Sequence, residues 1–389
     1  MKNKIQIYDL LSRHKDYFIL LVSTTYPFSE EELDKYGHLL RWKDIEGYGA
    51  NHGLSENGNL PWSVNILKKY DQKFDFRVIG YHIIGNKLWN NNLLSEMAKY
   101  CDWEALSCNS NIQWTTELIE NHKEQWDWKW LSGNNSILWN ENLIDNYHKY
   151  INWKSLCGNS DVIWSIELIN KYKQLIHWGN LSSQGQFSCD DIYKLIDKFS
   201  DKINWEELSS NHSKFWTEDF IEKFKEKLNW ENLSINSDLP WSVQLFEKYL
   251  SRWDMKLLSL IENLPWSVEF FNRYLDKWDF QLLSYNVALP WTKDFLAENS
   301  NKFFWYNLPL NSGLPWSEEL IDTFIYNWDW TVLSNCIPYN MFSLHFLLKY
   351  EDLIDWKYLS RNVLTELSDE DAHDVVIELL DVMNYSFEF

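Results

Sequence analysis

The sequence predicts an all-α fold, a right- or left-handed superhelical solenoid of about 13 helix–turn–helix repeats with a capping helix at each end. The first observation is a phrase that returns mostly every 25 residues, in related form, at Leu233–Trp241, Leu258–Trp266, Leu283–Trp291 and Leu308–Trp316. The second is that each unit repeats the same helix-start residues. The third is the abundance of Trp, with 25 residues in 389. A fixed period of 20–50 residues is typical of repeat architectures.

The first helix of each unit is predicted from an aromatic or Leu residue followed by Ser, Thr or Asn. These polar residues accept hydrogen bonds from the free N–H groups at a helix start. Apolar residues then keep helical spacing, as in Trp266, Phe270, Phe271, Tyr274 and Trp278, which predicts an amphipathic helix of about ten to twelve residues. The fourteen N-cap residues are Ser29, Ser63, Asn90, Thr115, Asn140, Ser165, Ser188, Thr217, Ser242, Ser267, Thr292, Ser317, Ser343 and Ser368.

A second, shorter helix is predicted from an acid or amide followed by an aromatic or Met residue and, three positions later, by Leu or Ile. An Asn ends most of these helices, because Asn tolerates the left-handed conformation, and its amide is also placed to bond the neighbouring unit. The predicted N-caps are Asp16, Asp75, Asp102, Asp127, Asn152, Asn204, Asn229, Asp254, Asp279, Asp329 and Asp355, and His177 occupies the same position in its unit.

The pattern fills the chain and predicts a single domain, residues 1–389. Residues 1–27 form an N-terminal cap with a helix over Lys4–Arg13, residues 28–366 form the repeats, and residues 367–389 form a C-terminal cap with a helix over Asp369–Met383. The Phe187 unit gains about one helical turn. An insertion, Glu46–Gly53, interrupts the pattern near the N-terminus.

This pattern, W-x-x-L-S-x-N followed by W-[ST]-x-E-L, resembles the Trp-rich helical repeats of giant-virus and bacterial repeat proteins, within the broad class of ankyrin-like and TPR-like α-solenoids. The resemblance covers the whole chain, although the ankyrin and TPR signatures themselves are absent. What it implies for function is the binding of other macromolecules.

Charge and composition narrow the function further. A net charge of −21 argues against binding to nucleic-acid phosphates and favours a protein partner with a neutral to basic surface. The N-terminus does not read as a signal peptide, no stretch predicts a membrane span, and the five cysteines form no C-x-x-C pair. We therefore expect a cytoplasmic protein with reduced thiols. The oligomeric state stays open.

We assign partner binding to residues that do not follow the repeat pattern. The Trp residues in the two main registers are expected to form the core, so contacts are assigned to aromatics outside them: Trp126, Trp130 and Trp253, with Trp278 and Trp328 in the same group. Tyr48 and His52, in the Glu46–Gly53 insertion, are the other candidates, against the simpler interpretation of a plain surface loop. Capping explains many of the acids. No motif predicts a catalytic residue, a cofactor site or a metal site.

Three functions follow as alternatives. The first is a non-enzymatic scaffold that binds a macromolecular partner along an acidic solenoid surface. The second is an acidic inhibitor or immunity-type protein that blocks a basic nucleic-acid-binding partner by charge mimicry. The third, an enzyme with a site in an irregular unit, is the least favoured. The sequence does not identify the partner or the face that binds it.

Overall fold

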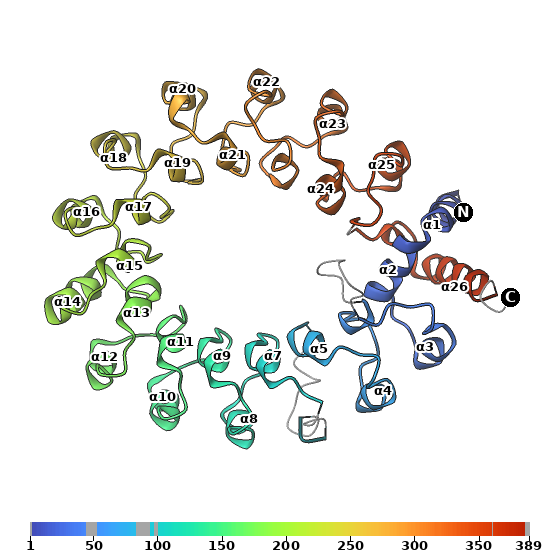
Figure 1. The fold of residues 1–389 in the computed structure, drawn as a ribbon, viewed down its shortest axis with the longest axis horizontal. Coiled ribbons are helices and arrows are strands. Elements are labelled where there is room, and N and C mark those ends of the chain that lie inside the picture. Colours follow the sequence, from blue (N-terminus) through green and yellow to red (C-terminus); the bar gives the residue numbers. More distant parts are fainter. Residues whose placement is uncertain (1, 44–52, 83–93, 97–99, 360, 386–389) are drawn as a thin grey trace. The chain divides into compact units, whose positions relative to one another are not determined.

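The computed structural model describes residues 2–43, 53–82, 94–96, 100–359 and 361–385, and every regular element within these ranges is a helix (Figure 1). The helices alternate between two kinds, as the repeat predicts. The first helices of the units are α3 (Glu30–Tyr36), α4 (Val64–Lys69), α8 (Thr116–Asn121), α10 (Glu141–Tyr147), α12 (Ile166–Lys171), α14 (Cys189–Phe199), α16 (Glu218–Phe224), α18 (Val243–Lys248), α20 (Val268–Arg273), α22 (Lys293–Glu298), α23 (Glu318–Thr323) and α25 (Leu344–Lys349).

The second helices stand between them. They are α2 (Lys15–Thr25), α5 (Phe76–His82), α7 (Trp103–Cys108), α9 (Trp128–Gly133), α11 (Trp153–Cys157), α13 (Trp178–Gln184), α15 (Trp205–Ser209), α17 (Trp230–Leu233), α19 (Met255–Leu258), α21 (Phe280–Leu283) and α24 (Trp330–Asn335). Single 3₁₀ turns are η1 (Gly53–Ser55), η2 (Leu275–Lys277), η3 (Leu308–Leu310) and η4 (Val363–Glu366), and the terminal helices are α1 (Lys2–Arg13) and α26 (Asp369–Tyr385).

The contacts of the chain group into two compact units. Unit 1 combines residues 1–127 with residues 329–389, and unit 2 is residues 128–328. The periodic pattern runs through both boundaries without interruption. In unit 2 the second helices α11, α13, α15 and α17 each contact the next, so that first and second helices form two separate rows (Figure 1).

The predicted N-caps of the first helices are confirmed wherever the structure describes them. In α18, the Ser242 hydroxyl accepts a hydrogen bond from the Leu245 N–H at 3.0 Å, and the other described units repeat this bond. The predicted length is wrong, however, because most first helices have only six or seven residues. An aromatic C-cap such as Tyr249 leaves the helical conformation, and a turn follows. The extra turn is confirmed in α14, which has 11 residues.

Most second-helix caps are also confirmed. Asn229 accepts from the Asn232 N–H, and the imidazole Nδ1 of His177 accepts from the Asn180 N–H at 3.2 Å. Two predicted caps are exceptions. Asp355 accepts from the Lys357 N–H at 3.2 Å, but the residues that follow it form a turn and not a helix. Asp16 lies inside α2, whose N-cap is His14 and makes no side-chain cap bond. The chain reaches α2 directly from α1, so the helix begins one residue before the expected cap.

The Asn that closes a second helix joins neighbouring repeats. Asn236 is fully buried, and its amide Nδ2 donates to the carbonyls of Ser209 and Asn211 in the preceding repeat at 3.1 and 3.0 Å. Its Oδ1 accepts from the Asp238 N–H at 2.9 Å. The predicted bond to the neighbouring repeat is therefore confirmed. The left-handed conformation is not, because no non-glycine residue in the described part of the chain has a positive φ.

The Ser that follows the buried Leu of the second helix, as in Leu233-Ser234, makes a second link between repeats. The buried Ser234 hydroxyl donates to the Trp230 carbonyl at 2.7 Å and accepts from the Asp254 N–H of the next repeat at 2.9 Å. Cys157 replaces this Ser in its repeat, and its Sγ accepts from the His177 N–H at 3.4 Å. The polar residues of the phrase thus hold adjacent repeats together around buried Leu side chains.

The two terminal segments of unit 1 pack against each other. Helix α1 contacts α26, and the Lys4 ammonium lies 2.7 Å from the Asp374 carboxylate. On α3, the Tyr36 hydroxyl donates to Asp381 of α26 at 2.8 Å. Helices therefore exist at both predicted terminal positions, and the two pack against each other.

Candidate interaction surface and a basic pocket

The structure separates the sequence-predicted contact residues into three groups. Trp130 is 40% exposed, as expected of a surface residue. Trp126 and Trp253 are only 4% and 6% exposed, so the expected exposure of these two side chains is wrong. Tyr48 and His52 lie outside the described residues.

Trp126 and Trp253 are buried because their indoles complete the first helix. The Trp253 Nε1 donates to the Phe246 carbonyl near the end of α18 at 3.0 Å, and the Trp126 Nε1 donates to the Ile119 carbonyl in α8 at 3.2 Å. A carbonyl in the last turn of a helix has no partner within the helix. Trp278 and Trp328 are buried with the same bond. Each of the four stands 12 residues after the Trp that precedes the N-cap of its first helix. This spacing is a third register of the repeat, and it identifies the four residues as core.

A row of exposed apolar side chains lies on unit 2. Ile235, Leu260, Tyr285 and Leu310 are 43%, 40%, 40% and 48% exposed. Each stands two positions after the buried Leu of its repeat, so the four share one register at 25-residue spacing. Three of them stand two residues after the ends of α17, α19 and α21, which are successive second helices (Figure 1). We call these four residues the apolar row.

The flank of the apolar row changes from acidic to aromatic along unit 2. Four positions before each row residue stand Glu231, Lys256, Gln281 and Tyr306, all exposed. In the preceding repeat this flank continues with the exposed acids Glu206 and Glu207. At the other end Tyr306 is 62% and Phe304 is 47% exposed. The Tyr285 hydroxyl donates to the Asn307 Oδ1 of the next repeat at 2.9 Å.

The row is not a consequence of packing within the repeat. The neighbouring Leu233, Leu258, Leu283 and Leu308 are fully buried and supply the core of their repeats. Single exposed apolar residues are common on protein surfaces. A contiguous set at one register is different, since exposed apolar patches of this kind mark interaction sites.

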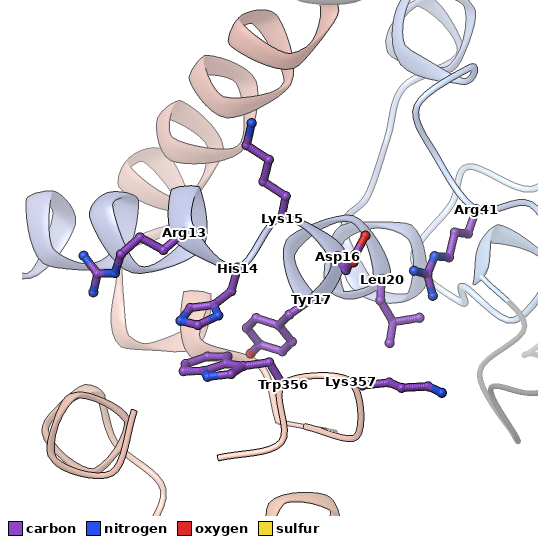
Figure 2. Close-up of a pocket in the computed structure, with 9 residues that line it drawn as sticks. All are labelled: Arg13, His14, Lys15, Asp16, Tyr17, Leu20, Arg41, Trp356 and Lys357. Carbon is purple, nitrogen blue, oxygen red and sulfur yellow. The ribbon is translucent and has the colours of Figure 1, made fainter. Parts of the chain in front are cut away.

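A second feature is a pocket of about 550 Å³ in unit 1, beside α2 (Figure 2). Asp16, Tyr17 and Leu20 of α2 form one wall, and Trp356 and Lys357 form another. The lining residues are Arg13, His14, Lys15, Asp16, Tyr17, Leu20, Arg41, Trp356 and Lys357. Four of them are Lys or Arg and one is Asp, in a chain whose net charge is −21.

Hydrogen bonds fix the aromatic groups of this pocket. The His14 ring stacks on Trp356 with 3.7 Å between ring centroids, and the Trp356 Nε1 donates to the Glu351 carbonyl at 3.1 Å. The Glu351 carboxylate accepts two bonds from Arg13, and Arg13 and then His14 lower the pKa of that carboxyl below its ordinary value. The Tyr17 hydroxyl donates to the Arg361 carbonyl, and burial raises the Tyr17 pKa.

A pocket of about 560 Å³ lies in unit 2, lined in part by Lys173, Lys198, Lys202 and Asp201. Its lining also includes the buried side chains of Ile176 and Phe199 and the half-buried Trp178. Among the described residues, no group of three or more His, Cys, Asp or Glu side chains is arranged to hold a metal ion. Within the same residues, no helix has the length and apolarity needed to cross a membrane.

Comparison with known protein families, curated proteins and solved structures finds no match for this chain. The resemblance to Trp-rich helical-repeat proteins therefore stays a prediction from the sequence.

Proposed function

We propose that the protein is a non-enzymatic scaffold, an α-solenoid of about 13 repeats that binds a protein partner along the second helices of unit 2. The observation that carries this proposal is the apolar row, Ile235, Leu260, Tyr285 and Leu310, whose side chains are exposed at one register in four successive repeats. Burying these side chains against a partner contributes favourably at roughly 25 cal/mol per Å² of apolar surface.

The flanking charges specify the partner. Glu206, Glu207 and Glu231 stand at one end of the row, and Phe304 and Tyr306 stand at the other. A complementary segment carries Lys or Arg beside its first apolar residues and only apolar or aromatic residues at its far end. Such a segment binds through the apolar contacts, while the charges set its direction and speed its association.

A displayed library of random peptides tests this proposal. Selection on the whole protein should enrich peptides that combine apolar residues with Lys or Arg. The double variant Leu260→Glu/Tyr285→Glu should reduce their binding by about tenfold or more, which corresponds to about 1.4 kcal/mol. The matched control is Leu138→Glu/Ile163→Glu, since Leu138 and Ile163 are also exposed apolar residues of unit 2, at 73% and 83%, but belong to another register.

Equal losses in both double variants would contradict the assignment of the surface. The charge-mimicry alternative predicts a different result, in which enriched peptides are strongly basic, lack apolar residues and bind the Leu260→Glu/Tyr285→Glu variant at least as well as the natural protein. Peptides with no preference for basic residues would contradict both.

A further inference from the structure

We propose that the apolar row binds its partner as a polyproline II segment, an extended chain with three residues per turn, that carries an apolar residue at every third position. This inference rests on the proposed scaffold function and specifies the conformation of the segment that the row recognises. An α-helix, a β-strand and a polyproline II chain each place the side chains of one face at a different spacing. The spacing of the row therefore selects among the three.

Hydrogen bonds between repeats set an upper limit on this spacing. Each row residue directly precedes the position that a buried Asn occupies in most repeats. The Nδ2 atoms of Asn286 and Asn311 donate to the carbonyls of Ile261 and Asn286, 25 residues earlier, at 3.2 and 3.1 Å. An Asn side chain extends about 3.8 Å from its Cα atom, and a carbonyl oxygen lies about 2.4 Å from the Cα atom of its own residue. Equivalent Cα atoms of these repeats are therefore at most about 9.4 Å apart.

The remaining pair of row repeats is joined in the same way as the others. Ile261 replaces the Asn between Ile235 and Leu260, but the bond from the Asp254 N–H to the Ser234 hydroxyl, at 2.9 Å, recurs in each pair along the row. Packed helices are also at least about 8 Å apart. The row therefore has a spacing between about 8 and about 9.4 Å.

Only polyproline II matches this spacing. It advances about 9.3 Å over three residues, which return to the same face. Positions i and i+7 of an α-helix lie about 10.5 Å apart, so a helix exceeds the limit by about 1 Å in each repeat and by about 3 Å along the whole row. Alternate residues of a β-strand lie only about 7 Å apart, so a strand falls short by at least a similar amount.

The width of the row favours the same conformation. Beside α17, α19 and α21, each repeat exposes one large apolar side chain, and the residue four positions earlier is Glu231, Lys256 or Gln281. An amphipathic helix has an apolar stripe about 100° wide and needs a broader apolar surface than this. A polyproline II segment has no internal hydrogen bonds, so its carbonyls can accept from donors beside the row, such as the exposed Gln281 amide and Tyr306 hydroxyl.

Charge determines where the basic end of the segment lies. The exposed carboxylates of Glu206, Glu207 and Glu231 form no ion pair within the described part of the chain, whereas Lys256 pairs with Asp279 at 3.6 Å. Lys or Arg residues of the segment therefore lie beside these three acids, and its last apolar residue lies beside Leu310. Opposite charges at one end fix the register of the segment on the row.

Calorimetric titration of the full chain with three synthetic peptides tests this inference. Each peptide has two Lys residues followed by four Leu residues, which recur at every third position of a Pro-containing chain, at every second position of a strand-forming chain, or at every seventh position of an Ala-rich helical chain. We expect the first peptide to bind at least tenfold more tightly than the other two. The variant Leu260→Glu/Tyr285→Glu should weaken its binding by about tenfold or more, and the control Leu138→Glu/Ile163→Glu should leave it unchanged.

Two results would overturn this inference while the scaffold function stands. In the first, the strand-forming or the helical peptide binds as tightly as the Pro-containing peptide and loses affinity in the Leu260→Glu/Tyr285→Glu variant. In the second, the Pro-containing peptide does not bind, although peptides selected from the random library bind through the row. Equal losses in the two double variants would overturn both proposals. The melting temperature of each variant, measured without peptide, separates loss of the surface from loss of the fold.

Discussion

Replacing Asn236 with Ala tests whether the buried amides hold the repeats together. Asn236 is fully buried and makes three hydrogen bonds with its side chain, two to the preceding repeat and one within its own loop. A hydrogen bond of this type contributes about 1 kcal/mol to stability. The expected loss is therefore about 3 kcal/mol of the free energy of unfolding of unit 2.

The matched control is Asn263→Ala. Asn263 is exposed and makes one bond across repeats, from its Nδ2 to the Ser237 carbonyl at 2.9 Å. Its loss should be below about 1 kcal/mol, because water replaces the amide. Urea unfolding followed by Trp fluorescence measures both variants, and amide hydrogen exchange should accelerate in α15 and α17 only for Asn236→Ala.

Two outcomes would refute this reasoning. If Asn236→Ala and Asn263→Ala lose the same small free energy, the buried amides do not connect the repeats energetically. If Asn236→Ala is strongly destabilised but exchange accelerates uniformly through unit 2, the amide acts on the unit as a whole and not on its own pair of repeats.

Four further predictions follow from the same contacts. Trp291→Ala should cost about 3–5 kcal/mol, because Trp291 is only 8% exposed, whereas Lys277→Ala on the surface should stay within about 0.5 kcal/mol; equal effects in thermal unfolding would contradict a Trp core. Ile163→Pro should raise stability by about 0.4–1 kcal/mol, since other repeats carry Pro at this register; a lower melting temperature would show that this loop differs. Tyr36→Phe should accelerate hydrogen exchange in α26, and unchanged exchange would show that the bond to Asp381 does not hold that helix. Lys225, with Tyr249 and Lys248, lowers the Glu222 pKa from 4.5 to about 2, so its stabilisation is present above pH 4.5 and is lost as the pH falls toward 2; a melting temperature that stays constant from pH 5 to pH 2.5 would contradict this.

Much of the local structure is predictable from the sequence because the repeat presents the same evidence many times. A single Ser before an apolar run, such as Ser242, is weak evidence for a helix start. Fourteen such residues at one register are strong evidence, and the described ones all act as caps. The lengths of the first helices are less predictable, because apolar spacing continues from Tyr249 to Trp253 although the helix has ended.

The candidate sites are less predictable than the helices. Exposure of a Trp depends on which backbone group its indole reaches, and Trp253 is buried only because the end of α18 lies within its reach. The apolar row is visible in the sequence as one register, yet Ile235 and Leu260 are indistinguishable there from core residues. The pocket joins Leu20 to Trp356, and no pattern in the sequence connects residues so far apart.

The two chain ends contact each other through the same pair of side chains that joins neighbouring first helices. On α4, the Tyr70 hydroxyl donates to Asp34 of the preceding first helix, and Lys69 pairs with the same carboxylate. On α3, Tyr36 and Lys35 make the same two contacts with Asp381 of α26.

Helix α26 therefore presents to α3 the acceptor that a preceding first helix would present. A polar capping helix was expected to end the repeats, but α26 continues the inter-repeat contacts across the chain ends. Because α3 and α26 make these contacts with each other, the chain ends offer a partner less of the shared repeat surface than the middle of the chain does. The apolar row of unit 2 is consequently a better candidate for the binding surface than the chain ends are.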